Sequence, residues 1–178
     1  MIRLFAAVAV PADIAADLAP RQKGILGARW RPYESLHVTL RFFGHLSEDK
    51  ADDLDSELSA ISGQSFDLAL RGVGVFGEGA DVHALWAAMA PSEPLVQLAR
   101  RCERAARRAG LACETRAYRP HVTLAYLHNA SSNEVGAWVQ QNNLLKSPSF
   151  RVGRFGLYSS WPGEDGAIYR LERAYSLA

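Results

Sequence analysis

Apolar and polar residues alternate along several short segments of this chain, and a period of two is typical of β-strands with one buried face. Longer segments between them carry apolar residues every three or four positions, which predicts amphipathic helices. The predicted strands cover approximately residues 2–10, 35–43, 66–76, 82–90, 118–127, 150–158 and 167–175. The predicted helices cover approximately residues 11–27, the segment after Ser47, residues 93–109 and the segment after Ser131.

The order of these elements repeats, because each half of the chain reads strand, helix, strand, helix, strand. Phe66 begins one predicted strand, and Phe150 begins its counterpart in the second half. A duplication of this kind predicts an α+β, bilobal fold in which two antiparallel-rich sheets flanked by helices are related by a pseudo-twofold axis across a central cleft. We therefore expect a single domain over residues 1–178, with lobes that cover roughly residues 1–80 and 81–178.

The tetrapeptide His-Val-Thr-Leu occurs twice, at residues 37–40 and 121–124, and the offset between these copies equals that between Phe66 and Phe150. Segment 85–89 likewise echoes segment 4–8. In both tetrapeptides the valine and leucine alternate with the histidine and threonine, so a strand would bury the first two and present the last two on its opposite face. The chain has five histidines, and a chance repeat of a whole tetrapeptide on matched elements is a poor explanation for two of them.

Two imidazoles beside two hydroxyls suit proton transfer around an anion. The unperturbed pKa of histidine is about 6.5, so His37 and His121 could act as a general acid and a general base near neutral pH. The hydroxyls of Thr39 and Thr123 can donate hydrogen bonds to the non-bridging oxygens of a phosphate.

Strand parity extends this candidate site, provided that no bulge intervenes. Arg41 and Phe43 would lie on the same face as His37, and Arg119 would lie on the same face as His121. The arginines could hold an anion and stabilise developing charge, and Phe43 could stack on a nucleobase. The alternatives are a solvated rim position for either arginine and a core position for Phe43.

Nothing in the sequence favours a metal or a cofactor. It has no H-E-x-x-H motif, and Cys102 and Cys113 lack the spacing of zinc or redox pairs. Residues 72–77 match G-x-G-x-x-G, but the dinucleotide fingerprint requires a helix to follow, and a turn and another strand are predicted there. We expect no metal and no cofactor.

Composition limits the partners. The residues are 48% hydrophobic and 22% charged, which is typical of a soluble globular protein, and the net charge of +1 argues against binding long nucleic acid by charge alone. No apolar run approaches the length of a membrane span. We expect a cytoplasmic protein without membrane association and, by default, a monomer.

Paired H-x-T-x motifs in a duplicated small α+β chain resemble the two-histidine (2H) phosphoesterase superfamily. The more specific resemblance is to the bacterial and archaeal RNA 2′,3′-cyclic phosphodiesterases, also called 2′-5′ RNA ligases. It is carried by four segments, which read RLFAA at 3–7, LHVTLRFFG at 36–44, LWA at 85–87 and RPHVTLA at 119–125.

This resemblance implies a bilobal fold with a catalytic cleft and metal-free opening of a terminal RNA 2′,3′-cyclic phosphate to a 2′-phosphate. It implies that His37 is the acid that protonates the departing 3′ oxygen and that His121 is the base that takes a proton from water. Thr39 and Thr123 would hold the phosphate. The chain departs from the family at Tyr126, where many relatives have arginine, which puts a basic contact to a longer RNA in doubt.

Three alternatives accompany this interpretation. The same residues could catalyse the reverse reaction, in which a 2′,3′-cyclic end and a 5′-hydroxyl are joined by a 2′-5′ linkage. The substrate could instead be a small cyclic or 2′-5′-linked nucleotide. The third alternative is a non-catalytic RNA- or nucleotide-binding module, although binding alone would not require two proton carriers.

Overall fold

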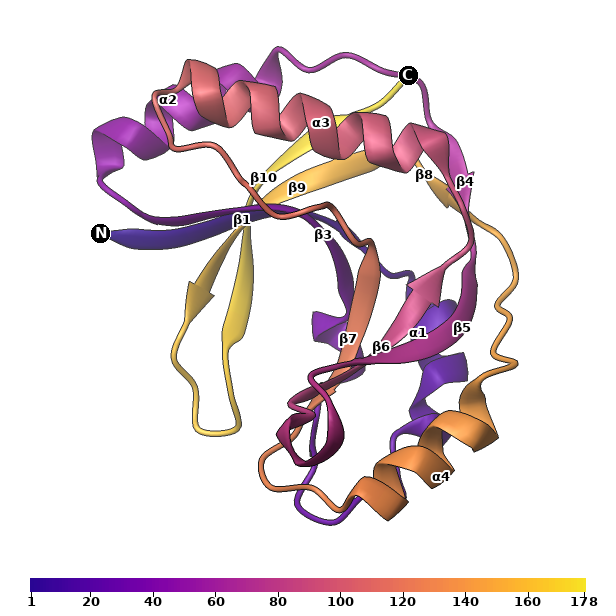
Figure 1. Cartoon of the computed structure of the whole chain (residues 1–178). Coiled ribbons are helices and arrows are strands. Elements are labelled where there is room, and N and C mark those ends of the chain that lie inside the picture. The colour runs from indigo at the N-terminus through magenta and orange to yellow at the C-terminus, as the bar shows by residue number, and fades with distance from the viewer.

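The computed structural model describes residues 1–178 as four α-helices, ten strands and short 3₁₀ turns (Figure 1). The helices are α1 (Ala12–Leu18), α2 (Glu48–Ser59), α3 (Glu93–Arg108) and α4 (Ser132–Asn142). The strands are β1 (Ile2–Ala9), β2 (Arg29–Trp30), β3 (His37–Leu46), β4 (Phe66–Leu68), β5 (Leu70–Phe76), β6 (Ala84–Met89), β7 (His121–Tyr126), β8 (Phe150–Val152), β9 (Arg154–Trp161) and β10 (Ile168–Ser176).

The strands form one large antiparallel sheet and one small one. The large sheet has the order β10-β9-β1-β3-β7-β6-β5, with β2 beside β7, and the small sheet pairs β4 with β8. The central strands of the large sheet, β3 and β7, are joined through the single residue pair Val38 and Val122. The α+β class is therefore confirmed, and the two expected sheets are the halves of one sheet that meet at this pair.

Pairing between equivalent positions reveals the pseudo-twofold axis. Val38 and Val122 occupy the same place in the two copies of the tetrapeptide, and they pair with each other. Asp67 and Arg151, at the centre of the small sheet, are equivalent positions of the repeat and also pair. The axis passes through both pairs. β1 lies against β3 as β6 lies against β7.

The two halves of the sequence exchange their outer elements. β9 comes from the second half but pairs with β1, whereas β5 comes from the first half and pairs with β6. Among the helices, α3 of the second half packs against α2 and β3 of the first half, and α4 contacts the exchanged strand β5 (Figure 1). Each end of the large sheet therefore contains segments from both sequence halves.

One predicted helix is shorter than expected. The helix expected over residues 11–27 ends at Leu18, and Ala19–Arg21 continues as a 3₁₀ turn. Pro20 explains this ending, because proline lacks the amide hydrogen that an α-helix requires and its ring crowds the carbonyl four residues earlier. Gly24 and Gly27 then adopt positive φ angles, so the chain reaches β2 as an irregular segment.

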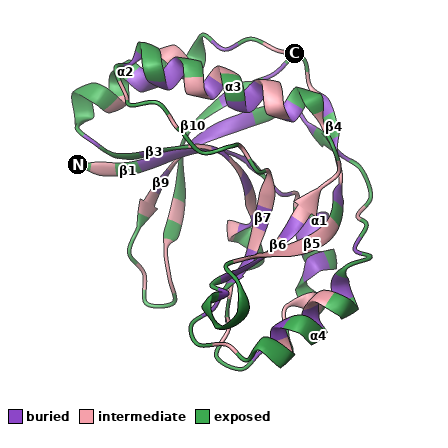
Figure 2. Cartoon of the chain, viewed as in Figure 1, coloured by how far each residue is buried: buried purple, intermediate pink, exposed green.

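The other helices follow the predicted pattern. Leu95, Leu98, Cys102 and Ala106 are all buried along α3. They belong to a continuous core of 42 residues that includes the central valine pair of the large sheet and the apolar residues of β4 and β8. Exposed residues recur along the outer sides of α2, α3 and α4, as Figure 2 shows. No helix of the structure has both the length and the hydropathy that a membrane-spanning helix requires.

Candidate active site

The repeated tetrapeptides meet at the centre of the large sheet. His37 begins β3 and His121 begins β7, and each precedes a fully buried valine of the central pair. Because side chains alternate along a strand, His37, Thr39, His121 and Thr123 share the face opposite the valines. We call this the motif face. Antiparallel register about the valine pair places each histidine level with the threonine of the other copy.

Both imidazole rings are held in the same way. Nδ1 of His37 donates to the carbonyl oxygen of Ser35 at 2.7 Å, and Nδ1 of His121 donates to that of Arg119 at 2.6 Å. A carbonyl can only accept, so each neutral ring carries its proton on Nδ1 and keeps the lone pair on Nε2. In His37 this Nε2 accepts from the Thr39 hydroxyl at 3.1 Å.

Aromatic side chains flank the two histidines. Phe5 and Tyr169 contact His37 with ring centroids 5.0 and 5.1 Å away. On the other side Phe76 lies edge-on to His121 at 4.8 Å, and Trp86 lies 5.9 Å away. Phe5 and Trp86 occupy equivalent places in the sequence repeat. Motif recognition alone did not identify these four residues, although the repeat of segments 4–8 and 85–89 does align Phe5 with Trp86.

The aromatic surroundings change the acidity of the imidazoles. Burial lowers the pKa of His37 from 6.5 to about 4; the Ser35 carbonyl acts in the opposite direction, and positive charge on Arg31 and His121 lowers the pKa further. Burial also lowers the pKa of His121, against the opposing hydrogen bond to the Arg119 carbonyl. Both rings are therefore neutral at pH 7 in the free protein, and an anion beside them would raise both pKa values.

The position of Thr39 is fixed by a contact from the second motif segment. The Tyr118 hydroxyl, three residues before His121, donates to the Thr39 carbonyl oxygen at 2.9 Å. Thr123 pairs in register with Trp86 of β6. The indole Nε1 of Trp86 is buried without a hydrogen-bond partner, so one donor in the wall beside His121 is unused.

Arg41 and Phe43 do not share the motif face, which corrects the parity argument. β1 pairs Ala7 with Thr39 and Ala6 with Arg41, so Leu40 is an extra residue in a β-bulge and the alternation reverses after it. Arg41 instead forms an ion pair with Glu103 of α3.

Phe43 is 9% exposed and belongs to the hydrophobic core. The aromatic residue on the motif face is its neighbour Phe42, which is 47% exposed, pairs with Phe5 and lies 5.6 Å from the Phe5 ring. Arg119 is exposed, and its side chain has no ion pair or hydrogen bond. Of the two arginines that strand parity suggested, Arg41 and Arg119, only Arg119 could therefore reach an anion near the histidines.

The chain has no group of three or more His, Cys, Asp or Glu side chains arranged to hold a metal ion. The polar groups of the motif face are two imidazoles and two threonine hydroxyls, and arginines lie nearby.

Comparison with known families identifies the superfamily of this chain. A model of the 2′-5′ RNA ligase superfamily matches residues 10–162, which include both motif strands. The chain belongs to the 2′-5′ RNA ligase superfamily. The match covers all four helices and every strand except β1 and β10.

Individual superfamily members are similar over different shares of their lengths. An Archaeoglobus fulgidus protein named RNA 2′,3′-cyclic phosphodiesterase is 26% identical over 177 residues, which are 98% of this chain and 99% of that protein. A Geobacillus stearothermophilus protein of the same name is 32% identical over 98 residues, which are 54% of this chain and 31% of that protein. The crystal structure of E. coli LigT complexed with 3′-AMP has a TM-score of 0.81 and 27% identity, covering 99% of this chain and 98% of that one.

This member of the 2′-5′ RNA ligase superfamily carries a buried arginine that sequence analysis did not identify. The Arg31 guanidinium lies 5.8 Å from the ring centroid of Tyr126 and 5.5 Å from that of Tyr169. Its Nη2 donates to the Ala167 carbonyl oxygen at 2.8 Å, and it forms no ion pair. Positive charge thus stands beside Tyr126, the position where the resemblance leads one to expect arginine, and it acts on the pKa of His37.

Proposed function

We propose that this chain is an RNA 2′,3′-cyclic phosphodiesterase that opens a terminal 2′,3′-cyclic phosphate and leaves a 2′-phosphomonoester. The observation that carries the proposal is the pairing of Val38 with Val122, since it puts two equivalently oriented histidines diagonally across the central strand pair on one face. The names of the full-length relatives support the same substrate class.

In the proposed reaction, water attacks the phosphorus atom in line with its bond to the 3′ oxygen. A new phosphorus–oxygen bond forms as the bond to the 3′ oxygen breaks. His121 takes a proton from the water through Nε2, and His37 gives its Nε2 proton to the departing 3′ oxygen. The products carry a phosphate on the 2′ oxygen and a free 3′-hydroxyl, and neither step requires a metal ion.

The low pKa of His37 gives substrate binding a specific role. In the free protein its Nε2 is unprotonated and accepts from Thr39. The negative charge of a bound cyclic phosphate favours the imidazolium, so His37 acquires its proton when the anion arrives. The Thr39 hydroxyl is then free to donate to a non-bridging phosphate oxygen, and Thr123 is the equivalent donor beside the other strand.

Both motif strands come from one chain, which supports a monomer as the active form. We place that monomer in the cytoplasm, where RNA ends or small cyclic nucleotides would be its partners. Ligation would use the same two histidines, because a 5′-hydroxyl would replace water as the nucleophile that loses its proton to His121, while the same 3′ oxygen departs with a proton from His37. Adding RNA with a 5′-hydroxyl to the assay measures whether a 2′-5′ linkage also forms.

The test is incubation of a short RNA carrying a 2′,3′-cyclic phosphate with the protein in excess EDTA, followed by separation of 2′- from 3′-phosphate products. Wild type should yield the 2′-phosphate. His37→Ala and His121→Ala should each lower the rate by at least about 100-fold, because general acid–base catalysis contributes roughly 10²–10⁴. His45→Ala is the matched control, since His45 is exposed on the same strand as His37 and should be dispensable.

Circular dichroism of each variant shows whether it folds. Full activity of a folded His37→Ala or His121→Ala variant would overturn the assignment. Activity that appears only after a divalent metal is restored would overturn the metal-free mechanism. Tight RNA binding without any product would point to a binding module.

A further inference from the structure

The motif face continues beyond the histidines onto β1, β9 and β10. β1 pairs Ala9 with His37 and Ala7 with Thr39, and Ala7 pairs in turn with Gly156 of β9. Extending that register by two residues sets Arg154 level with Ala9. Neighbouring strands lie about 4.8 Å apart, so the backbone of Arg154 is about 10 Å from that of His37, with only an alanine between them.

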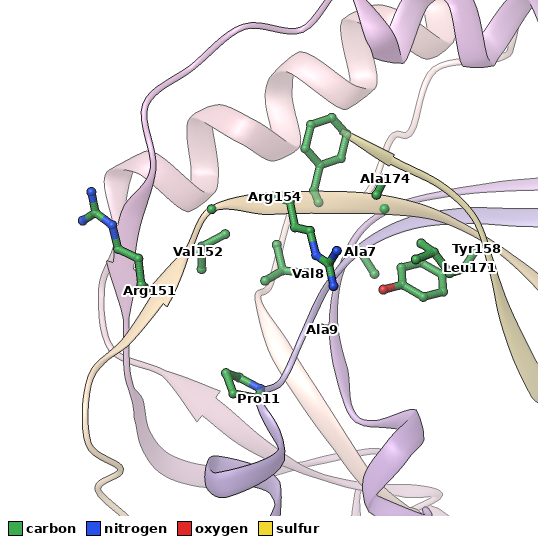
Figure 3. Close-up of a pocket in the computed structure, with 13 residues that line it drawn as sticks. Ala7, Val8, Ala9, Pro11, Arg151, Val152, Arg154, Tyr158, Leu171 and Ala174 are labelled. Carbon is green, nitrogen blue, oxygen red and sulfur yellow. The ribbon is translucent and has the colours of Figure 1, made fainter. Parts of the chain in front are cut away.

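A cavity of about 210 Å³ lies over this part of the sheet (Figure 3). Its floor is made of small residues, among them Ala7, Gly156 and Ala174, which pair with one another across three strands. A side-chain carbon on Gly156 would lie 2.6 Å from Leu171 and 2.7 Å from Tyr158. The missing side chain therefore lets these two larger residues bound the cavity.

Two polar groups at this cavity have no partner in the protein. The Arg154 side chain forms no ion pair or hydrogen bond, although Arg151 at the rim is paired with Asp67. The Tyr158 hydroxyl also has no hydrogen-bond partner, and its ring stacks on Phe5 at 5.5 Å. Figure 3 shows the Arg154 guanidinium and the Tyr158 hydroxyl turned toward each other above the floor.

A free guanidinium and a free phenol hydroxyl together form an arrangement of donors that suits a phosphate group. We propose that Arg154 and Tyr158 bind a second phosphate, the one attached to the 5′ oxygen of the same nucleoside whose 2′,3′-cyclic phosphate reacts at His37 and His121. The sugar would cross the alanine floor between the two phosphates. This inference rests on the proposed function and adds a specificity-determining site to it.

The second phosphate could be a 5′-phosphomonoester or the phosphodiester of an RNA chain, and comparing three substrates distinguishes these two sources. The substrates are a nucleoside 2′,3′-cyclic phosphate, the same molecule with a 5′-phosphate, and a dinucleotide ending in the cyclic phosphate. Wild type should turn over the second and third with a kcat/KM about tenfold higher than the first, because one charge-assisted hydrogen bond contributes about that factor. A gain for the dinucleotide alone would identify the RNA diester as the natural ligand, and an equal gain would identify any 5′-phosphate.

Arg154→Gln should remove this gain and leave turnover of the unphosphorylated cyclic nucleotide unchanged. Ala174→Leu, which adds bulk to an exposed floor position, should have the same selective effect. Arg170→Gln is the control, because Arg170 is an exposed arginine of β10 that contacts Trp161 and does not line the cavity.

The result that overturns the inference is a gain from the 5′-phosphate that survives in Arg154→Gln, or no gain in wild type. Either result is informative while the unphosphorylated cyclic nucleotide is still hydrolysed. Absence of turnover with all three substrates contradicts the proposed function instead, so the two failures are distinguishable.

Discussion

At the scale of single residues, His37 couples the candidate site to protein stability. Its pKa in the folded chain is about 4, below the ordinary value of 6.5. Between those two pH values the unfolded chain binds a proton that the folded chain does not, so the free energy of unfolding must fall as the pH falls through this window. The shift corresponds to a loss of roughly 3 kcal/mol, complete near pH 4.

Urea unfolding of wild type and His37→Gln at pH 7, 5.5 and 4 (about the limits and middle of that window) measures this loss. Glutamine does not titrate, so the variant should lose less stability between pH 7 and 4 than wild type, whereas His45→Gln should behave as wild type does. Identical pH dependence in wild type and His37→Gln would show that the imidazole is not kept neutral by the fold.

Residue-scale patterns identified the two histidines and two threonines but misplaced their neighbours. Alternation correctly put Val38 in the core, because no irregularity precedes it in β3. It failed for Arg41 and Phe43, since the bulge at Leu40 is set by pairing with β1, a partner distant in the sequence that local alternation does not specify. Arg31 was missed because its environment is built entirely from distant segments.

At the scale of elements, the ion pair between Arg41 of β3 and Glu103 of α3 stabilises the packing of α3 against β3. The two side chains are 11% and 26% exposed, so water screens this pair much less than a surface pair. Glu103→Gln would leave a largely buried guanidinium without its counter-charge and should lower the free energy of unfolding by about 1–3 kcal/mol.

The small sheet supplies a matched control for that variant. Arg151 and Asp67 form an ion pair with side chains 61% and 60% exposed, and Asp67→Asn should cost less than about 1 kcal/mol. Denaturant titration of both variants at one pH makes the comparison. Equal losses would mean that burial of the Arg41 pair contributes nothing to the attachment of α3.

Element boundaries show where sequence patterns lack information. The strand expected over residues 66–76 is divided at Ala69, and the one expected over 150–158 is divided at Gly153, the equivalent position of the repeat. In each case the first part pairs across the pseudo-twofold axis and the second part joins the large sheet. Alternation predicts that a segment is extended, but it does not say which strand will be its partner.

At the scale of the whole molecule, the exchange of outer elements determines how the chain can unfold. β5 is the edge strand beside β6, and β9 lies between β1 and β10, so a chain cut near residue 80 would separate β5 from β6 and β9 from β1. The single core of 42 residues likewise draws on both sequence halves. We therefore propose that the two lobes form one cooperative domain, although the repeat marks two units in the sequence.

Thermal unfolding followed by far-ultraviolet circular dichroism and by tryptophan fluorescence tests this proposal. The four tryptophans include Trp86 in β6 and Trp161 in β9, on opposite sides of the central pair, so fluorescence reports on both lobes. The two probes should give coincident single transitions. Fragments 1–80 and 81–178 should each lack a cooperative transition and regain one when mixed, because only the mixture restores the exchanged strands. Independent cooperative unfolding of either fragment would show instead that the duplicated units remain separate domains.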